Sequence, residues 1–170
     1  VGASVVNALS RWVTVEVFTQ NRSYKQEFES AEGPDGKIVS GRPKYPLTET
    51  GRTRKQGSLI TFMPDDRVFE TVEWSYDVIM RRLRELAYLN RGVKLTLEDQ
   101  RPGKKGRRDE FCFEGGLSDF VRYLNSESTP LYDTPLHIGG KSGDLLVDLA
   151  LQHNDRPPLS QQRVPAIEAS

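Results

Sequence analysis

Hydrophobic and polar residues alternate along several parts of this chain, and that alternation predicts strands. Residues 13–18, 24–29, 93–98 and 145–151 place an apolar or aromatic side chain at nearly every second position. Side chains in a strand point to opposite faces in turn, so this period is typical of a sheet with one covered face. Residues 58–63 are expected to form a further strand that ends at Pro64, and 110–113 to pair with 93–98 as a hairpin.

A different period predicts helices. Between residues 75 and 90 the apolar side chains share one helical face; they are Tyr76, Ile79, Met80, Leu83, Leu86 and Ala87. Ser75 is suited to cap the amino end of this helix, and Gly92 to end it. Shorter helices are expected at 4–10 and 117–124.

Two regions lack either period. Residues 32–57 are rich in glycine and proline, which predicts a long loop with at most one short edge strand. Residues 156–170 contain three prolines and scattered charge, which predicts a disordered tail. The order of elements indicates an α+β fold, with an antiparallel or mixed sheet and helices on one face.

Composition narrows the class of protein. The chain has 170 residues, and its 24 basic and 24 acidic residues cancel, so net charge gives no sign of nucleic-acid binding. Cys112 is the single cysteine, which excludes an internal disulfide and fits a cytoplasmic location. No apolar run approaches the ~20 residues of a membrane helix, so no membrane contact is expected. The chain opens on Val1 rather than Met, and we expect it to begin inside a domain.

Two short stretches suggest ligand contacts. The sequence VGASVVNALS brings small residues into a helix start, whose free amides suit phosphate. From these ten residues alone, packing of that helix against a sheet is the favoured interpretation, since a lone glycine pattern is a weak signal. The sequence RPGKKGRR, residues 101–108, holds five basic residues that suit DNA phosphates, although net neutrality and the lack of aromatic residues favour a solvated hairpin loop. The spacing of His137 and His153 is not that of metal ligands. The sequence contains no nucleophile motif, and no pattern in it identifies a carboxylate as a general base.

Five segments in series resemble a known family. They are VGASVVNALS, KQGSLITFMPD, RRLRELAYLNRGVKLTLEDQR, FCFEGGLSDFVRYLN and VDLALQHND. In this order they resemble the ATPase region of bacterial type II DNA topoisomerase B subunits, of gyrase or topoisomerase IV. The resemblance implies the carboxyl half of a Bergerat (GHKL-type) α/β sandwich in residues 1–114. A linker helix and the first strands of a transducer domain would follow in 115–155, and a tail foreign to the family in 156–170.

The resemblance also implies site residues. The first segment completes a glycine-rich lid motif, in which the backbone amides of Val1, Gly2 and Ala3 would face the β- and γ-phosphates of ATP. The second resembles a Thr-Gly-Thr motif, in which the Ser58 hydroxyl would help hold adenine, Gly57 would precede it and Ile60 would line the pocket. The family's catalytic glutamate, its Mg²⁺-binding asparagine and its adenine-reading aspartate fall before Val1. Its γ-phosphate lysine falls after residue 155, so no catalytic residue or metal ligand is expected in this chain.

The implied intact protein is an ATP-hydrolysing DNA topoisomerase, an isomerase that uses ATP and Mg²⁺. Its partners would be DNA, the gyrase A subunit and a second B subunit, and this chain alone is expected to be inactive. One alternative is a non-enzymatic nucleic-acid or partner-binding module that uses the 101–108 loop. Another is an ATPase fragment of a repair protein. The sequence of residues 81–99 disfavours it, because it resembles the gyrase family and not the related ATPases. Gyrase and topoisomerase IV are not distinguished.

Overall fold

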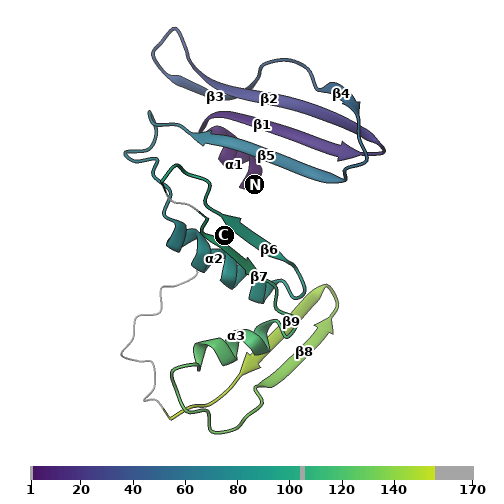
Figure 1. The fold of residues 1–170 in the computed structure, drawn as a ribbon, viewed down its shortest axis with the longest axis vertical. Coiled ribbons are helices and arrows are strands. Elements are labelled where there is room, and N and C mark those ends of the chain that lie inside the picture. The colour runs from purple at the N-terminus through teal and green to yellow at the C-terminus, as the bar shows by residue number, and fades with distance from the viewer. Residues whose placement is uncertain (1, 104–105, 156–170) are drawn as a thin grey trace. The chain divides into compact units, whose positions relative to one another are not determined.

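The computed structural model describes residues 2–103 and 106–155, which form two compact units divided between Trp74 and Ser75 (Figure 1). The first unit contains α1 (Gly2–Ala8), β1 (Ser10–Thr19), β2 (Arg22–Glu32), β3 (Ile38–Pro43), β4 (Thr48–Arg52) and β5 (Gly57–Pro64). The second contains α2 (Tyr76–Leu89), β6 (Leu95–Glu98), β7 (Arg108–Phe111), α3 (Leu117–Leu124), β8 (Leu136–Ser142) and β9 (Leu145–Leu151). The predicted α+β class is confirmed. The proposed domain limits at 114 and 155 stay predictions.

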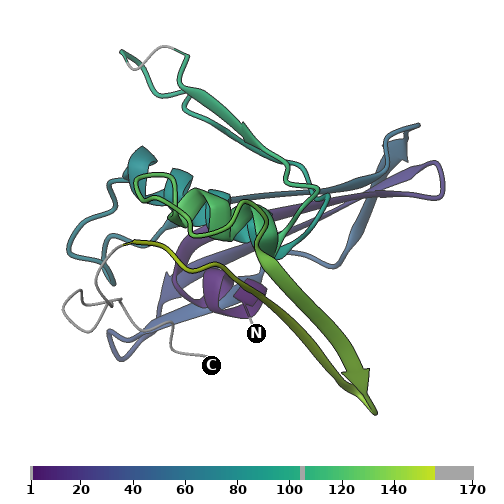
Figure 2. The same cartoon turned by 90° about the horizontal axis from the view of Figure 1, so that it is seen from below.

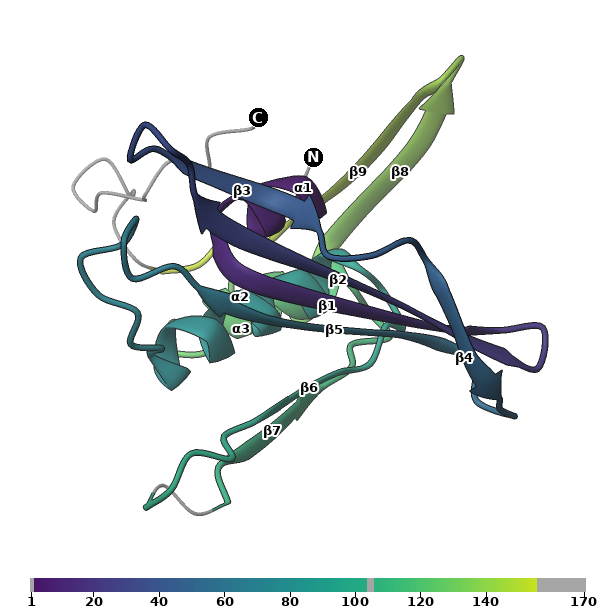
Figure 3. The same cartoon turned by 90° about the horizontal axis from the view of Figure 1, so that it is seen from above.

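The first unit is built on one antiparallel sheet in the order β3-β2-β1-β5, with β4 also paired to β2 (Figures 1 and 3). The β1–β2 hairpin turns at Gln20 and Asn21, whose φ angles are 51° and 60°. Two such residues make the turn whose twist matches that of paired strands. Among the described strands, β5 pairs with β1 alone, so its other side is an edge.

Residues 32–57 differ from the sequence prediction. They hold two short strands, β3 and β4, instead of at most one, and both pair with the long strand β2 at opposite ends. Short strands of this kind form because a long neighbour offers free backbone groups, which periodicity does not reveal. Helix α1 also begins earlier than predicted, and Ser10 already belongs to β1.

The second unit is organised around α2, and its predicted caps are confirmed. The Ser75 hydroxyl accepts a hydrogen bond from the amide of Val78 at 3.4 Å, and Gly92 has a φ of 74° just beyond the helix. Figure 2 shows α3 lying beside α2, with the β8–β9 hairpin extending away from the two helices.

Aromatic rings hold α2 and α3 together. Tyr88 is 5% exposed, and its ring stacks on Phe113 with centroids 3.7 Å apart and on Phe120 at 5.0 Å. Stacked pairs of this kind add stability beyond the area they bury. The helix α3 and the strand β9 have the predicted limits, whereas β8 was not predicted from the sequence.

None of the helices in the described residues is long and apolar enough to cross a membrane. The predicted disorder of 156–170 lies outside the described residues.

Candidate nucleotide site

One face of the paired strands β1 and β5 carries mainly apolar side chains. In the register of β1 and β5, Val17 lies opposite Ser58, Val15 opposite Ile60 and Val13 opposite Phe62. Directly paired residues of antiparallel strands share a face, so these six side chains lie on the same side of the sheet. The opposite face is mixed, because its intervening positions carry Thr14, Glu16 and Thr61 but also the apolar side chains of Trp12, Leu59 and Met63.

The helix α1 packs against β1 and β3 and leaves its apolar side chains free to line a cleft. A close approach at Gly41 fixes this packing: a Cβ added there would lie 3.0 Å from Nδ2 of Asn7, and its φ of 69° also disfavours other residues. The hydroxyl of Ser10 donates to the carbonyl of Val6 at 2.6 Å, which ties the end of the helix to the start of β1.

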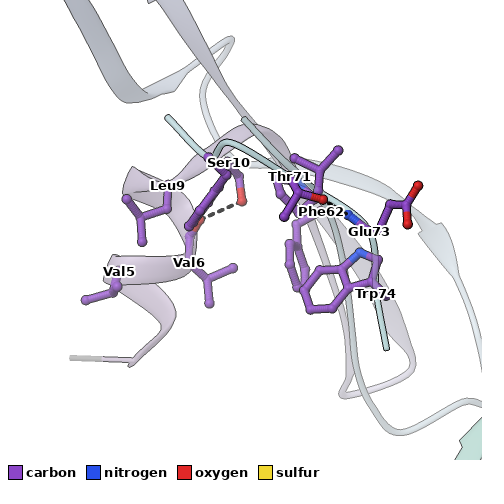
Figure 4. A pocket seen from close by; sticks show the side chains of 11 residues that line it. Val5, Val6, Leu9, Ser10, Phe62, Thr71, Glu73 and Trp74 are labelled. Carbon is purple, nitrogen blue, oxygen red and sulfur yellow. Dashed lines mark hydrogen bonds between the residues drawn. The ribbon is translucent and has the colours of Figure 1, made fainter. Parts of the chain in front are cut away.

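An apolar cleft of about 300 Å³ lies between α1, β5 and the segment that follows β5. Its walls are Val5, Val6, Leu9 and Ser10, then Phe62 and Pro64, then Phe69, Thr71, Val72, Glu73 and Trp74. Phe62 and Trp74 meet edge to face with centroids 5.9 Å apart, and Figure 4 shows this pair across the cleft from Val5 and Val6. A concave, mainly apolar surface with a few polar groups is typical of a small-molecule site.

A buried ion pair fixes the end of β5 beside the cleft. The Asp65 side chain is 1% exposed; its Oδ1 accepts from Nε of Arg67 at 2.8 Å and its Oδ2 from Nη2 at 2.6 Å. The amide of Asp65 donates to the carbonyl of Leu9 at 3.0 Å, and Arg67 Nη2 donates to Oγ of Ser30 at 2.8 Å. The Arg67 guanidinium holds the pKa of Asp65 far below its ordinary value. This pair therefore joins β5, β2 and the connection from α1 to β1.

None of the sequence-predicted residues that the structure describes lines this cleft. Gly2 and Ala3 begin α1 and are exposed, three and two positions before Val5; Val1 lies outside the described residues. On β5, Gly57, Ser58 and Ile60 are exposed, and Ile60 lies on the same face as Phe62, two positions further along. Gly57 has a φ of 120°, a conformation in which other residues are strained.

Sequence reasoning missed the cleft residues Phe62, Phe69 and Trp74 and the Asp65–Arg67 pair. The cleft residues are scattered apolar positions that the fold alone brings together. The ion pair carries a local signal, because an aspartate two residues before an arginine recurs at Asp99 and Arg101 with the same bidentate geometry, at 2.9 and 2.6 Å.

Metal-ligating side chains do not gather at any one place in the part of the chain that the structure describes. No group of three or more His, Cys, Asp or Glu side chains is placed to hold a metal ion within residues 2–103 and 106–155. Ser58 presents an exposed hydroxyl and Ile60 an exposed apolar side chain on the same face of the sheet.

The basic loop of the second unit is largely neutralised by its own neighbours. Its described cations pair as Arg101 with Asp99, Arg107 with Asp77 at 2.7 Å, and Arg108 with Glu98 at 3.5 Å. The Arg107 guanidinium also lies 4.1 Å from the ring centroid of Tyr76. Cations already paired with carboxylates gain less from phosphate, which favours the solvated-loop interpretation.

No protein-family model matches the chain. Curated relatives do: it is 42% identical over 156 residues to the B subunit of DNA topoisomerase 4 from Enterococcus faecalis and 41% identical over 156 residues to the B subunit of DNA gyrase from Treponema pallidum. Each match covers 91% of this chain but only 21% and 23% of the relative, so the chain spans about a fifth of their length.

The fold agrees with the sequence matches. The crystal structure of the 43K ATPase domain of Thermus thermophilus gyrase B, in complex with an aminocoumarin, is similar with a TM-score of 0.74 and 33% identity. The match covers 90% of this chain and 39% of that one.

Proposed function

We propose that this chain, a segment of the B-subunit family of bacterial type II DNA topoisomerases, supplies one wall of an ATP site. The observation that carries the proposal is the shared sheet face of Ser58, Ile60 and Phe62, with the cleft under α1 at its end. The Ser58 hydroxyl would hold the adenine, directly or through water, and Ile60 would cover its ring. The amides of Val1, Gly2 and Ala3 would meet the β- and γ-phosphates, as the family resemblance implies.

The intact protein would couple ATP binding and hydrolysis to DNA strand passage. Its partners would be DNA, the gyrase A subunit and a second B subunit. Mg²⁺ would be held by the family's asparagine, which the resemblance does not place among the residues of this chain. This chain's contribution would be to orient the base and to present backbone amides, not to move a proton.

The proposal is tested by grafting. Residues 2–155 would replace the matching segment of the Thermus thermophilus gyrase B ATPase domain, and the KM for ATP of the graft would be measured. We expect turnover, and a Ser58→Ala change that raises the KM about three- to tenfold, the effect of losing one hydrogen bond.

Thr61→Ala is the matched control. It removes a hydroxyl from the same strand on the opposite face and should leave the KM unchanged. A folded graft that binds no ATP, or equal effects of the two changes, would contradict the proposal. The alternative binding module loses support from the ion pairs that occupy the basic loop.

A further inference from the structure

A cluster of cations lies at one end of the sheet of the first unit. The β1–β2 turn and the segment 51–56 meet there, and together they carry Arg22, Arg52, Arg54 and Lys55, all exposed. We call this group the cationic tip. Glu49 is the acidic residue of the adjoining strand β4, and it pairs with Arg22 at 2.6 Å. The tip is therefore strongly positive in a chain whose net charge is zero.

The backbone of the cationic tip is ordered by hydrogen bonds between its two loops. The amide of Thr53 donates to the carbonyl of Asn21 at 3.0 Å, and the hydroxyl of Thr50 donates to Oγ of Ser23 at 2.8 Å. The amide of Lys55 donates to Oγ1 of Thr53 at 3.1 Å. The cations are thus held on a framework that does not have to be ordered when a ligand binds.

Like charges face one another within this framework. Arg22 on β2 lies directly opposite Arg52 on β4, a cross-strand arrangement that destabilises a sheet. Glu49 neutralises Arg22, whereas Arg52 and Arg54 have no ion-pair partner among the described residues. This contrasts with the 101–108 loop, whose described cations are paired. A polyanion would relieve the repulsion at the cationic tip.

We propose that the cationic tip binds the phosphate backbone of duplex DNA. Arginine forks match phosphate oxygens in a bidentate manner, which favours a phosphate ligand. Two aromatic rings beside the tip already contact its cations: Phe18 has the Lys55 ammonium 5.7 Å over its ring centroid, and Tyr24 interacts with Arg22. Neither ring is therefore a free platform for stacking unpaired bases. The contact is with the backbone of a duplex and carries no sequence preference.

The test is DNA binding by the full chain without ATP, so its outcome is independent of the proposed nucleotide site. Fluorescence anisotropy with a labelled duplex of about two helical turns would be measured over a series of salt concentrations. The variant R52Q/R54Q/K55Q is expected to bind about tenfold more weakly at low salt, with a salt slope shallower by about three, since it removes three cations and each lost phosphate contact removes about 0.9. R52K/R54K, which keeps the charge, should retain most of the affinity.

A loop variant, K104Q/K105Q/R108Q, has the same loss of charge and should bind DNA nearly as the unchanged chain does. Circular dichroism of each variant checks that the fold is kept. Unchanged affinity of the tip variant, or equal losses in the tip and loop variants, would overturn the proposal. Tip-dependent binding of poly-glutamate that matches or exceeds that of DNA would assign the surface to an acidic protein instead and would overturn it as well.

Discussion

Arg67 holds both carboxylate oxygens of Asp65, two residues before it, at 2.8 and 2.6 Å, and Asp65 is buried at the end of β5. Replacing Arg67 by Met would leave a buried carboxylate without its cation. We expect the free energy of unfolding to fall by about 3 kcal/mol, the lower end for a broken buried pair, because the Arg67 side chain is 32% exposed.

Urea titration at neutral pH measures this loss. Arg11→Met is the control, because Arg11 and Asp66 form an exposed pair at 3.1 Å, with side chains 55% and 58% exposed. Its loss should cost less than about 1 kcal/mol. Equal losses for the two variants would show that the Asp65 pair has no special role.

The same pair predicts a dependence of stability on pH. The pKa of Asp65 is lowered in the folded state from an ordinary value of 3.8. Its contribution is therefore complete above that value, declines as the pH falls below it, and is lost once the pH passes below the folded pKa. Asp65→Asn should flatten this part of the stability curve, which urea midpoints between pH 6 and the lowest pH that keeps the chain folded would reveal.

We expect the 170-residue chain to show no ATP hydrolysis above background. The family resemblance implies that neither the catalytic glutamate nor the Mg²⁺-binding asparagine is among the residues of this chain, so positioning and charge stabilisation would be lacking. A phosphate-release assay, with and without DNA, checks this. Turnover that Gly2→Pro abolishes would contradict the expectation, since that change alters the start of α1.

Binding of ATP to the chain should be weak or absent. With only one wall of the pocket present, most of the nucleotide stays in water. The few contacts then formed do not offset the free-energy cost of ordering the nucleotide and removing water from its polar groups. Isothermal calorimetry should give no measurable heat at micromolar chain concentrations. A micromolar Kd would show that the cleft beside α1 is a sufficient site.

Hydrogen exchange should separate the two units. The amides of α2, with its cap and its buried Ala87 and Tyr88, are expected to be the most protected. Amides of residues 2–20 and of β5 should exchange faster, because β5 is exposed along most of its length and pairs only with β1 among the described strands. Equal protection of 2–20 and α2 in a monomer would contradict this.

The edge of β5 also predicts association. Gly57–Pro64 carries no charge, and Leu59, Ile60 and Met63 are about half exposed. Uncharged apolar edges invite pairing with another chain, and a lysine on such an edge opposes it. Light scattering should therefore show concentration-dependent assembly that Thr61→Lys reduces.

Local signals in the sequence predicted much of this fold. These signals are the apolar stripe and the Ser75 cap of α2, the alternation of β9 and the apolar spacing of α3. Each involves residues close together in the sequence, so each can be recognised before the fold is known. The strand β8 was missed because Gly139 and Gly140 interrupt its pattern; it exists through pairing with β9. In the same way, β3 and β4 depend on β2.

The candidate sites also combine residues that the sequence could indicate with residues that only the fold brings together. Ser58 and Ile60 were assigned by family resemblance, and their role stays a prediction. The cleft residues Phe62 and Trp74 and the cationic tip combine positions far apart in the chain. Arg22 and Arg52 are thirty residues apart in number yet directly opposite in register, so no window of sequence reveals their juxtaposition.

The arrangement of β3 and β4 on the outer side of β2 has a practical consequence. The strand β1 pairs with both β2 and β5. Residues 33–56, which contain β3 and β4, lie between β2 and β5 in the sequence. Lengthening the turn between β2 and β3, around Pro34 and Asp35, adds an entropic cost of closing the loop. This cost is about 0.6 kcal/mol for each doubling of the loop length. That turn is therefore the position at which an affinity tag or a fluorophore can be inserted while β1, β5 and the cleft keep their geometry.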